Sequence, residues 1–159
     1  MIILNSIYEV LKGRLKAISS VKQVDWFNGQ YNNMDDEKAT KYPAVYVEFL
    51  DPINWVQSGN KFQHASVGIR LHCVLFDLLD SPLRTLTFSQ AIYENINSKS
   101  LYDTNDFQLT TEMVRTATTF PKRYNQLKVV KMDFNCEVFD VTGMPIVEEV
   151  TNLGFIINP

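Results

Sequence analysis

The chain has 159 residues and a formal net charge of −3 at pH 7, with 45% hydrophobic and 21% charged residues. This length is that of one ordinary domain, and the composition is that of a folded globular protein rather than a disordered one. The mildly acidic balance excludes a broad basic field for nucleic acid, and the apolar runs are shorter than the ~20 residues of a membrane helix. The first residues lack a basic leader, so we expect no signal peptide.

An amphipathic helix is predicted at the start of the chain. Its apolar residues recur at helical spacing: Ile3, Ile7, Leu11, Leu15 and Ile18. Gly13 lies inside this pattern and costs about 1 kcal/mol relative to alanine, so we expect it to mark a close contact of the helix. A short strand over residues 21–27 should follow and end at an Asn-Gly turn, and residues 30–41 are polar enough for an exposed loop.

Two stretches of strict alternation, residues 62–76 and 127–140, are the clearest pattern in the sequence. Apolar side chains take the odd positions of the first stretch and the even positions of the second. Because successive side chains of a strand point to opposite faces, each stretch is predicted to be a strand with one apolar and one polar face. At ~3.3 Å per residue each would be roughly 45 Å long, against a usual ~17–20 Å. We expect such strands to overhang the domain and reach a neighbouring subunit.

The remaining elements complete the predicted fold. A strand over 42–50 begins at a proline, and a helix begins at Asp80-Ser81-Pro82, with the proline near its first position, and runs to about Lys99. Residues 113–119 are predicted to form another strand. The fold class is therefore α+β: a single, mainly antiparallel sheet with two long strands and two helices packed on one face. Residues 1–140 form one domain. Residues 141–159 are a C-terminal extension, which either adds an edge strand or lies on a partner as an interaction arm.

Both cysteines, Cys73 and Cys136, lie on the apolar parity of the two long strands. We interpret them as small, reduced core residues. A disulfide between them would require the two strands to be neighbours in register, which spacing alone does not show.

The sequence contains no catalytic or metal-binding motif. His72 and Cys73 are adjacent in a strand and point to opposite faces, so the histidine cannot activate the thiol. His64 and His72 share a face but lie roughly 26 Å apart, too far for one zinc ion, and we expect both to be exposed. The polar segment at 103–106 lacks the spacing of a calcium loop. The acidic cluster at 35–37 would bind a divalent ion only with ligands from elsewhere in the chain, and we interpret it as a solvated loop. We therefore expect no enzyme activity, no cofactor and no metal.

Candidate interface residues lie on the polar faces of the long strands and in a basic, aromatic turn at 121–126. They are Arg70, His72, Lys122, Arg123, Tyr124 and Lys131. The polar faces carry both signs of charge, so they line water, pair with a neighbouring sheet or are simply solvated. The turn contacts phosphates or an acidic protein surface, or is an ordinary soluble turn.

The predicted elements, taken in this order, resemble those of a known group of proteins over most of residues 1–140. The elements that carry this resemblance are the opening helix 3–18, the proline-led strand 42–47, the long strand 67–76, the helix 83–99 and the closing strand 130–140. Their pattern resembles that of the tail terminator (tail-completion) proteins of long-tailed bacteriophages and, more loosely, of other head–tail junction ring proteins. The extension after Val141 departs from the shorter members of this group.

The resemblance implies a structural virion protein that forms a homo-oligomeric ring, usually a hexamer. Such a ring caps the tail tube, stops its growth and joins it to neck or connector proteins, while DNA only passes through. It would be assembled in the host bacterial cytoplasm and reside in the virion tail or neck, with no membrane. Alternatives are another phage neck, connector-ring or baseplate structural protein, and a small α+β ligand-binding domain or enzyme.

Overall fold

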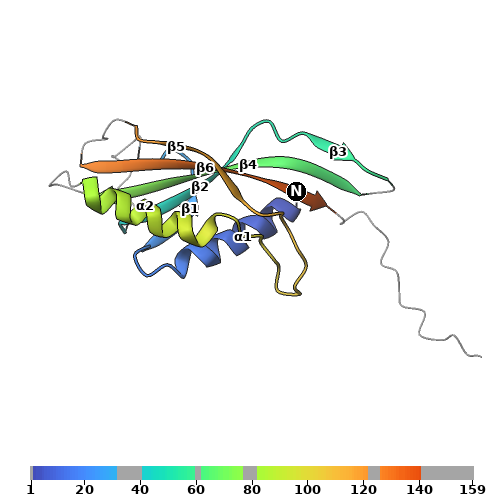
Figure 1. Cartoon of the computed structure of the whole chain (residues 1–159), viewed down its shortest axis with the longest axis horizontal. Helices are drawn as coiled ribbons and strands as arrows, with labels where there is room; N and C mark the ends of the chain where they lie inside the picture. Colours follow the sequence, from blue (N-terminus) through green and yellow to red (C-terminus); the bar gives the residue numbers. More distant parts are fainter. Residues whose placement is uncertain (1, 32–40, 60–61, 77–81, 122–125, 141–159) are drawn as a thin grey trace, which may run out of the picture.

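The computed structural model describes residues 2–31, 41–59, 62–76, 82–121 and 126–140. These residues form two helices and one six-stranded sheet (Figure 1). The helices are α1 (Ile2–Lys16) and α2 (Pro82–Ile96). The strands are β1 (Gln23–Trp26), β2 (Ala44–Leu50), β3 (Trp55–Gln57), β4 (Gln63–Phe76), β5 (Val114–Thr119) and β6 (Leu127–Asp140).

The sheet has the order β1-β2-β4-β6-β5, with β3 paired to β4 beside this path. All pairs are antiparallel except β1 with β2, which is parallel. The predicted α+β class with a mainly antiparallel sheet is therefore confirmed. The parallel pair and β3 were not predicted, because β1 and β3 have only four and three residues and such short strands give no clear alternation.

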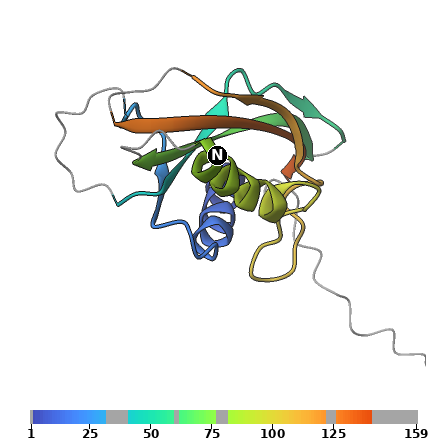
Figure 2. The ribbon, with the colours of Figure 1, turned by 60° about the vertical axis from the view of Figure 1, so that its left-hand side comes forward.

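Both helices cover the same face of the sheet, as Figures 1 and 2 show. The apolar stripe of α1, including Ile7, Leu11 and Leu15, is fully buried in the core beneath the sheet. The odd-numbered apolar residues of β4 and the even-numbered ones of β6 line the same core. The two alternating stretches thus form the predicted two-faced strands, with the apolar face toward the helices.

β4 and β6 pair along their whole length, from Gln63 opposite Asp140 to Phe76 opposite Leu127. Their other neighbours are shorter: β5 pairs only with residues 131–135 of β6. The register sets Cys136 opposite Val67 and Cys73 opposite Val130, so the cysteines lie roughly 20 Å apart along the strands. A disulfide between them is excluded, and both are free, buried thiols in the core as expected.

Gly13 does not mark a close helix contact, and that prediction is wrong. The residue is exposed, and a methyl group added there would meet no heavy atom within 4 Å. The helical pattern of α1 is confirmed, and α2 begins at Pro82 as predicted but ends at Ile96, three residues before the expected boundary. Ser98, just beyond α2, has a φ of 57°, a left-handed conformation that ends the helix.

Candidate functional site

A row of charged residues crosses the face of the sheet opposite the helices. Glu48 on β2 lies opposite Arg70 on β4, which lies opposite Asp133 on β6. Arg70 donates two hydrogen bonds, from Nε to Asp133 Oδ1 at 2.7 Å and from Nη2 to Oδ2 at 2.8 Å. Its Nη1 lies 3.9 Å from Glu48 Oε2. The hydrogen bonds to Asp133 raise the pKa of the Arg70 guanidinium, so these three charges form a fixed row.

His72 lies beside this row and is completely buried, with 0% of its surface exposed. Its Nε2 is 2.8 Å from Glu48 Oε2, and its Nδ1 is 2.6 Å from the Tyr31 hydroxyl oxygen. The ring of Phe27 stacks on the imidazole at a centroid distance of 3.8 Å and an angle of 14°. The expectation that both histidines are exposed is thus wrong for His72, because residues 27–31 fold over this part of the sheet.

The neutral imidazole satisfies both of these hydrogen bonds. With the proton on Nε2, His72 donates to Glu48 and its Nδ1 accepts from the hydroxyl of Tyr31. Burial lowers the pKa of His72, although the hydrogen bond and charge of Glu48 act in the opposite direction. Because His72 and Tyr31 are only 0% and 2% exposed, a substrate has no access to the imidazole or to the Tyr31 hydroxyl. The contacts of His72 with Tyr31 and Phe27 instead hold residues 27–31 against the sheet.

The structure brings together three of the six candidate interface residues. Arg70, His72 and Lys131 lie on the same face of β4 and β6, and His72 is directly opposite Lys131 in register. Arg70 and Lys131 are half-buried, whereas His72 is enclosed. In the conformation described, His72 cannot touch another subunit. Lys122, Arg123 and Tyr124 lie outside the described residues.

Phe27 and Tyr31 are the members of this cluster that the sequence patterns missed. Both surround the Asn28-Gly29 turn, where Gly29 has a φ of 85°, a conformation that favours glycine. The signal in the sequence that could have indicated this cluster is a pair of aromatic residues four positions apart on either side of such a turn. No periodicity indicated that they would fold back over a strand.

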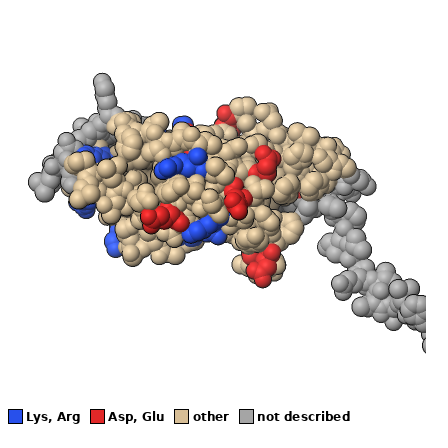
Figure 3. Space-filling view, in the orientation of Figure 1, with Lys and Arg blue, Asp and Glu red and all other residues tan. Residues whose placement is uncertain are grey.

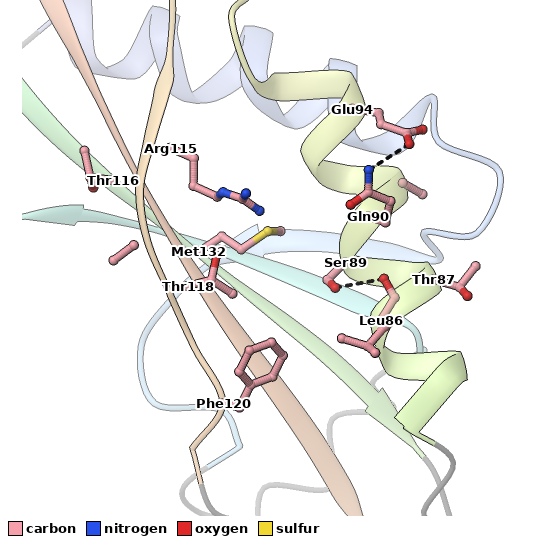
Figure 4. A pocket seen from close by; sticks show the side chains of 12 residues that line it. Leu86, Thr87, Ser89, Gln90, Glu94, Arg115, Thr116, Thr118, Phe120 and Met132 are labelled. Atoms are coloured by element: carbon pink, nitrogen blue, oxygen red, sulfur yellow. Dashed lines mark hydrogen bonds between the residues drawn. The ribbon is translucent and has the colours of Figure 1, made fainter.

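A second candidate surface, also missed, is an open groove of about 970 Å³ between α2 and β5. We call it the α2–β5 groove. Figure 4 shows side chains from the two elements on its opposite walls, with Met132 of β6 between them. Its lining includes Leu86, Gln90 and Glu94 from α2, and Arg115, Thr116, Thr118 and Phe120 from β5 and the residue after it.

The groove combines apolar and cationic surface. Two of its lining residues, which lie near each other in Figure 4, are largely exposed: Leu86 is 50% and Phe120 is 60% exposed. Large exposed apolar side chains that gather in one place mark interaction sites. The Arg115 guanidinium lies 4.0 Å from the centre of the Tyr93 ring. Within the described part of the chain, no carboxylate lies within ion-pair distance of Arg115. The groove thus offers apolar contacts, a carboxylate (Glu94) and a cation, Arg115, that has no acidic partner among the described residues.

Charged side chains are few on the face shown in Figure 3, where they are scattered among a larger uncharged area. Among the residues that the structure places, no group of three histidine, cysteine or acidic side chains could hold a metal ion. No helix in those parts of the chain is long and apolar enough to cross a membrane.

Comparison with known proteins shows the fold and no family. No family model and no curated protein matches the chain. A chain from a solved structure, the virion of a native gene transfer agent (GTA) particle, matches with a TM-score of 0.58 and 9% identity, covering 87% of this chain and 98% of that one. At this identity the likeness is one of fold: nearly the whole of that virion chain shares the arrangement described here.

Proposed function

We propose that this chain is a structural virion protein, and specifically a ring-forming tail terminator. In this role it caps the tail tube and joins the tube to the head or neck. The observation that carries the proposal is the fold likeness to a virion chain, which extends over 98% of that chain. The element order that resembles tail terminators, from α1 to β6, points in the same direction.

The sheet supports assembly because its two outermost strands differ. β1 is a four-residue strand paired in parallel to β2, and β5 is a six-residue strand paired antiparallel to β6. Unpaired edges of a sheet are ready templates for contact with another chain. Since the two edges are unlike, an edge of one copy that contacts a different surface of its neighbour joins copies head to tail, and such contacts form a ring when the rotation closes.

A ring around DNA should let it pass rather than hold it. The net charge of −3 and the pairing of Arg70 with Asp133 and Glu48 leave little free positive charge on the polar face of the sheet. Tight binding to DNA needs several cations in contact with phosphates. We therefore propose that DNA is passing cargo and that the protein partners are further copies, the tail tube and the neck.

The second candidate is another phage neck, connector-ring or baseplate protein, which the same fold likeness favours equally. We place an enzyme behind both, because the one histidine with two polar partners, His72, is enclosed. The α2–β5 groove contains Arg115 and Glu94, and Glu94 accepts a hydrogen bond from Gln90 at 2.9 Å. These residues do not form a nucleophile with a base.

Two measurements on the full-length chain test this function. Light scattering and negative-stain images should show a closed ring at high micromolar concentration, alone or after addition of tail-tube protein. A monomer under both conditions would overturn the ring. When tube protein polymerises, a terminator should stop growth and cap tube ends, whereas a connector ring should leave tube length unchanged. Bovine serum albumin at equal mass is the control for nonspecific effects on tube length.

A further inference from the structure

Among the residues that the structure describes, no strand pairs with the outer edge of β5. β5 is the last strand in the sheet order, and five of its six residues pair with β6, Thr116 being skipped at an irregularity between Arg115 and Ala117. On the other side the Arg115 backbone N–H donates to Asn97 Oδ1 at 3.0 Å. Thr116 and Ala117, at the middle of the strand, are exposed. An extended segment that pairs here would lie along the α2–β5 groove.

The C-terminal extension has the composition that this groove requires. Residues 141–159 contain two carboxylates and neither lysine nor arginine. Within residues 146–157 the larger apolar residues are Ile146, Val147, Val150, Leu153, Phe155, Ile156 and Ile157. The groove supplies the complementary features. Its Leu86 and Phe120 are exposed, and its Arg115 guanidinium has no acidic partner among the residues that the structure describes. The charge complementarity is local, between the carboxylates of the extension and Arg115, because Glu94 also lines the groove.

We propose that residues 146–157 of a neighbouring copy add a strand to the outer edge of β5. Glu148 or Glu149 pairs with Arg115, and apolar side chains of the extension cover Leu86 and Phe120. Backbone hydrogen bonds provide the affinity of such strand addition, and the side chains in the groove fix its register. This inference rests on the proposed function, because it gives the ring its contact between subunits.

The path of the chain favours a neighbouring copy over the same copy. β6 passes Met132 at the groove and ends eight residues later at Asp140, ~27 Å further along the strand. On the β5 side of β6, Thr110 already pairs with Val138, and the Thr111 N–H donates to the Glu137 carbonyl at 2.9 Å. A return within one copy would have to reverse and cross this segment.

The length of the extension suits the crossing to a neighbour. It has 159 − 140 = 19 residues, which span at most about 65 Å when extended. Residues 141–145 would bridge the copies, and residues 146–157 would dock. Pro145 lies before the docking segment, where a residue without an N–H does not interrupt the added strand.

Photo-crosslinking on the full-length chain tests the contact directly. Benzoylphenylalanine at position 117, on the exposed middle of β5, should crosslink to residues 141–159 in bands of dimer size and larger. The matched control carries the same label at Asn5, which is exposed on α1, and should not capture the extension. The proposal would be overturned if the label at position 117 crosslinks to residues 141–159 only in a band of monomer size. It would also be overturned if the label crosslinks to any other segment.

A charge exchange tests the proposed ion pair. Arg115→Glu should reduce the crosslink yield at least several-fold, and the triple variant Arg115→Glu, Glu148→Lys, Glu149→Lys should restore it. Lys99→Glu, which changes an exposed cation just after α2, should leave the yield unchanged. If the triple variant stays as weak as Arg115→Glu, the pairing is wrong.

Native mass spectrometry before irradiation separates failure of this contact from failure of the ring. A ring that crosslinks elsewhere overturns the strand addition and leaves the proposed function intact. A full-length chain that stays monomeric even with tail-tube protein overturns both.

Discussion

Arg70 and Asp133 are joined side by side across β4 and β6 by two hydrogen bonds of 2.7 and 2.8 Å. Their side chains are only 31% and 17% exposed, so the pair is partly shielded from water. Two parallel bonds between a guanidinium and a carboxylate are stronger and more directional than a single ion contact. The pair thus fixes the register of the two long strands on the polar face.

Replacing Asp133 with asparagine should lower the free energy of unfolding by about 1–2 kcal/mol, because the partly buried guanidinium loses its charged acceptor. Arg70→Lys should also destabilise the protein, since lysine keeps the charge but cannot form the two-bond fork. Urea unfolding monitored by circular dichroism measures both changes. Asn135→Asp is the matched control on the exposed part of β6, and a loss there equal to that of Asp133→Asn would contradict a specific role for the pair.

Gly13→Ala should stabilise the protein by roughly 0.5–1 kcal/mol, because alanine has less conformational freedom to lose in a helix than glycine. The added methyl group meets no heavy atom within 4 Å, so no clash opposes this gain. The midpoint of thermal unfolding should rise by a few degrees. An unchanged or lower midpoint would show that the exposed side of α1 has a contact in the assembled protein.

Gly68→Ala should have the opposite effect. A methyl group at Gly68 on β4 would lie 3.1 Å from Leu50 Cδ1 and 3.2 Å from Leu50 Cβ, closer than ordinary contact. The Leu50 side chain must move, which should cost about 1–3 kcal/mol of stability. Leu50→Ala in the same chain should recover part of this loss, as a double-mutant cycle would measure. Strictly additive losses would place the strain elsewhere.

The buried imidazole of His72 should make the protein less stable in mild acid. Burial lowers the pKa of His72 below its ordinary value of 6.5, so the unfolded chain binds a proton at a higher pH than the folded one. Tyr31, Glu48, Arg70 and Lys131 surround the ring. The contribution is therefore complete above about pH 6.5 and falls as the pH drops toward the folded pKa, by at most ~1.4 kcal/mol per pH unit.

Urea unfolding at about pH 7.5 and about pH 5.5 measures this loss, in a range where most carboxylates stay ionised. His72→Gln should be less stable than the parent at the higher pH, since it loses the stack on Phe27. It should also show a smaller difference between the two pH values. An equal difference in both proteins would assign the pH dependence to other groups.

The two cysteines should be unreactive in the folded protein. Burial raises the pKa of Cys136 to about 12 and raises that of Cys73 further, and the thiolate is the reactive form. A thiol reagent such as DTNB should therefore label neither residue in native buffer and both in urea. Rapid labelling of Cys136 without urea would show that the sheet opens locally.

The long strands were predictable from the sequence because each keeps one parity apolar for its whole length. That pattern fixes which face of β4 and β6 meets the helices, as Ile69 and Phe134 in the core illustrate. The pairing of β1 with β2 was not predictable, because four residues carry no periodicity and their partner follows only after a long connection. The two-layer α+β architecture could thus be predicted more completely than the strand order.

The candidate surfaces were harder to predict than the fold. The burial of His72 depends on Phe27 and Tyr31, which reach it from a segment 41 positions earlier in the case of Tyr31. Nothing in the alternation of β4 distinguishes His72 from His64, which is partly exposed. The α2–β5 groove arises from the spacing between a helix and an edge strand, and this spacing is a property of the packing rather than of any local pattern.

The continuous pairing of β4 with β6 has a mechanical consequence. Each strand has 14 residues, and every one has a partner across the ladder. Because the hydrogen bonds of an antiparallel pair run perpendicular to the strands, tension along the strand axis loads all of them together, whereas a pull at one end would open them one by one. We therefore expect β4 and β6 to resist a force that slides them past each other along the strand axis. They should separate most easily when one end of a strand is pulled away from its neighbour.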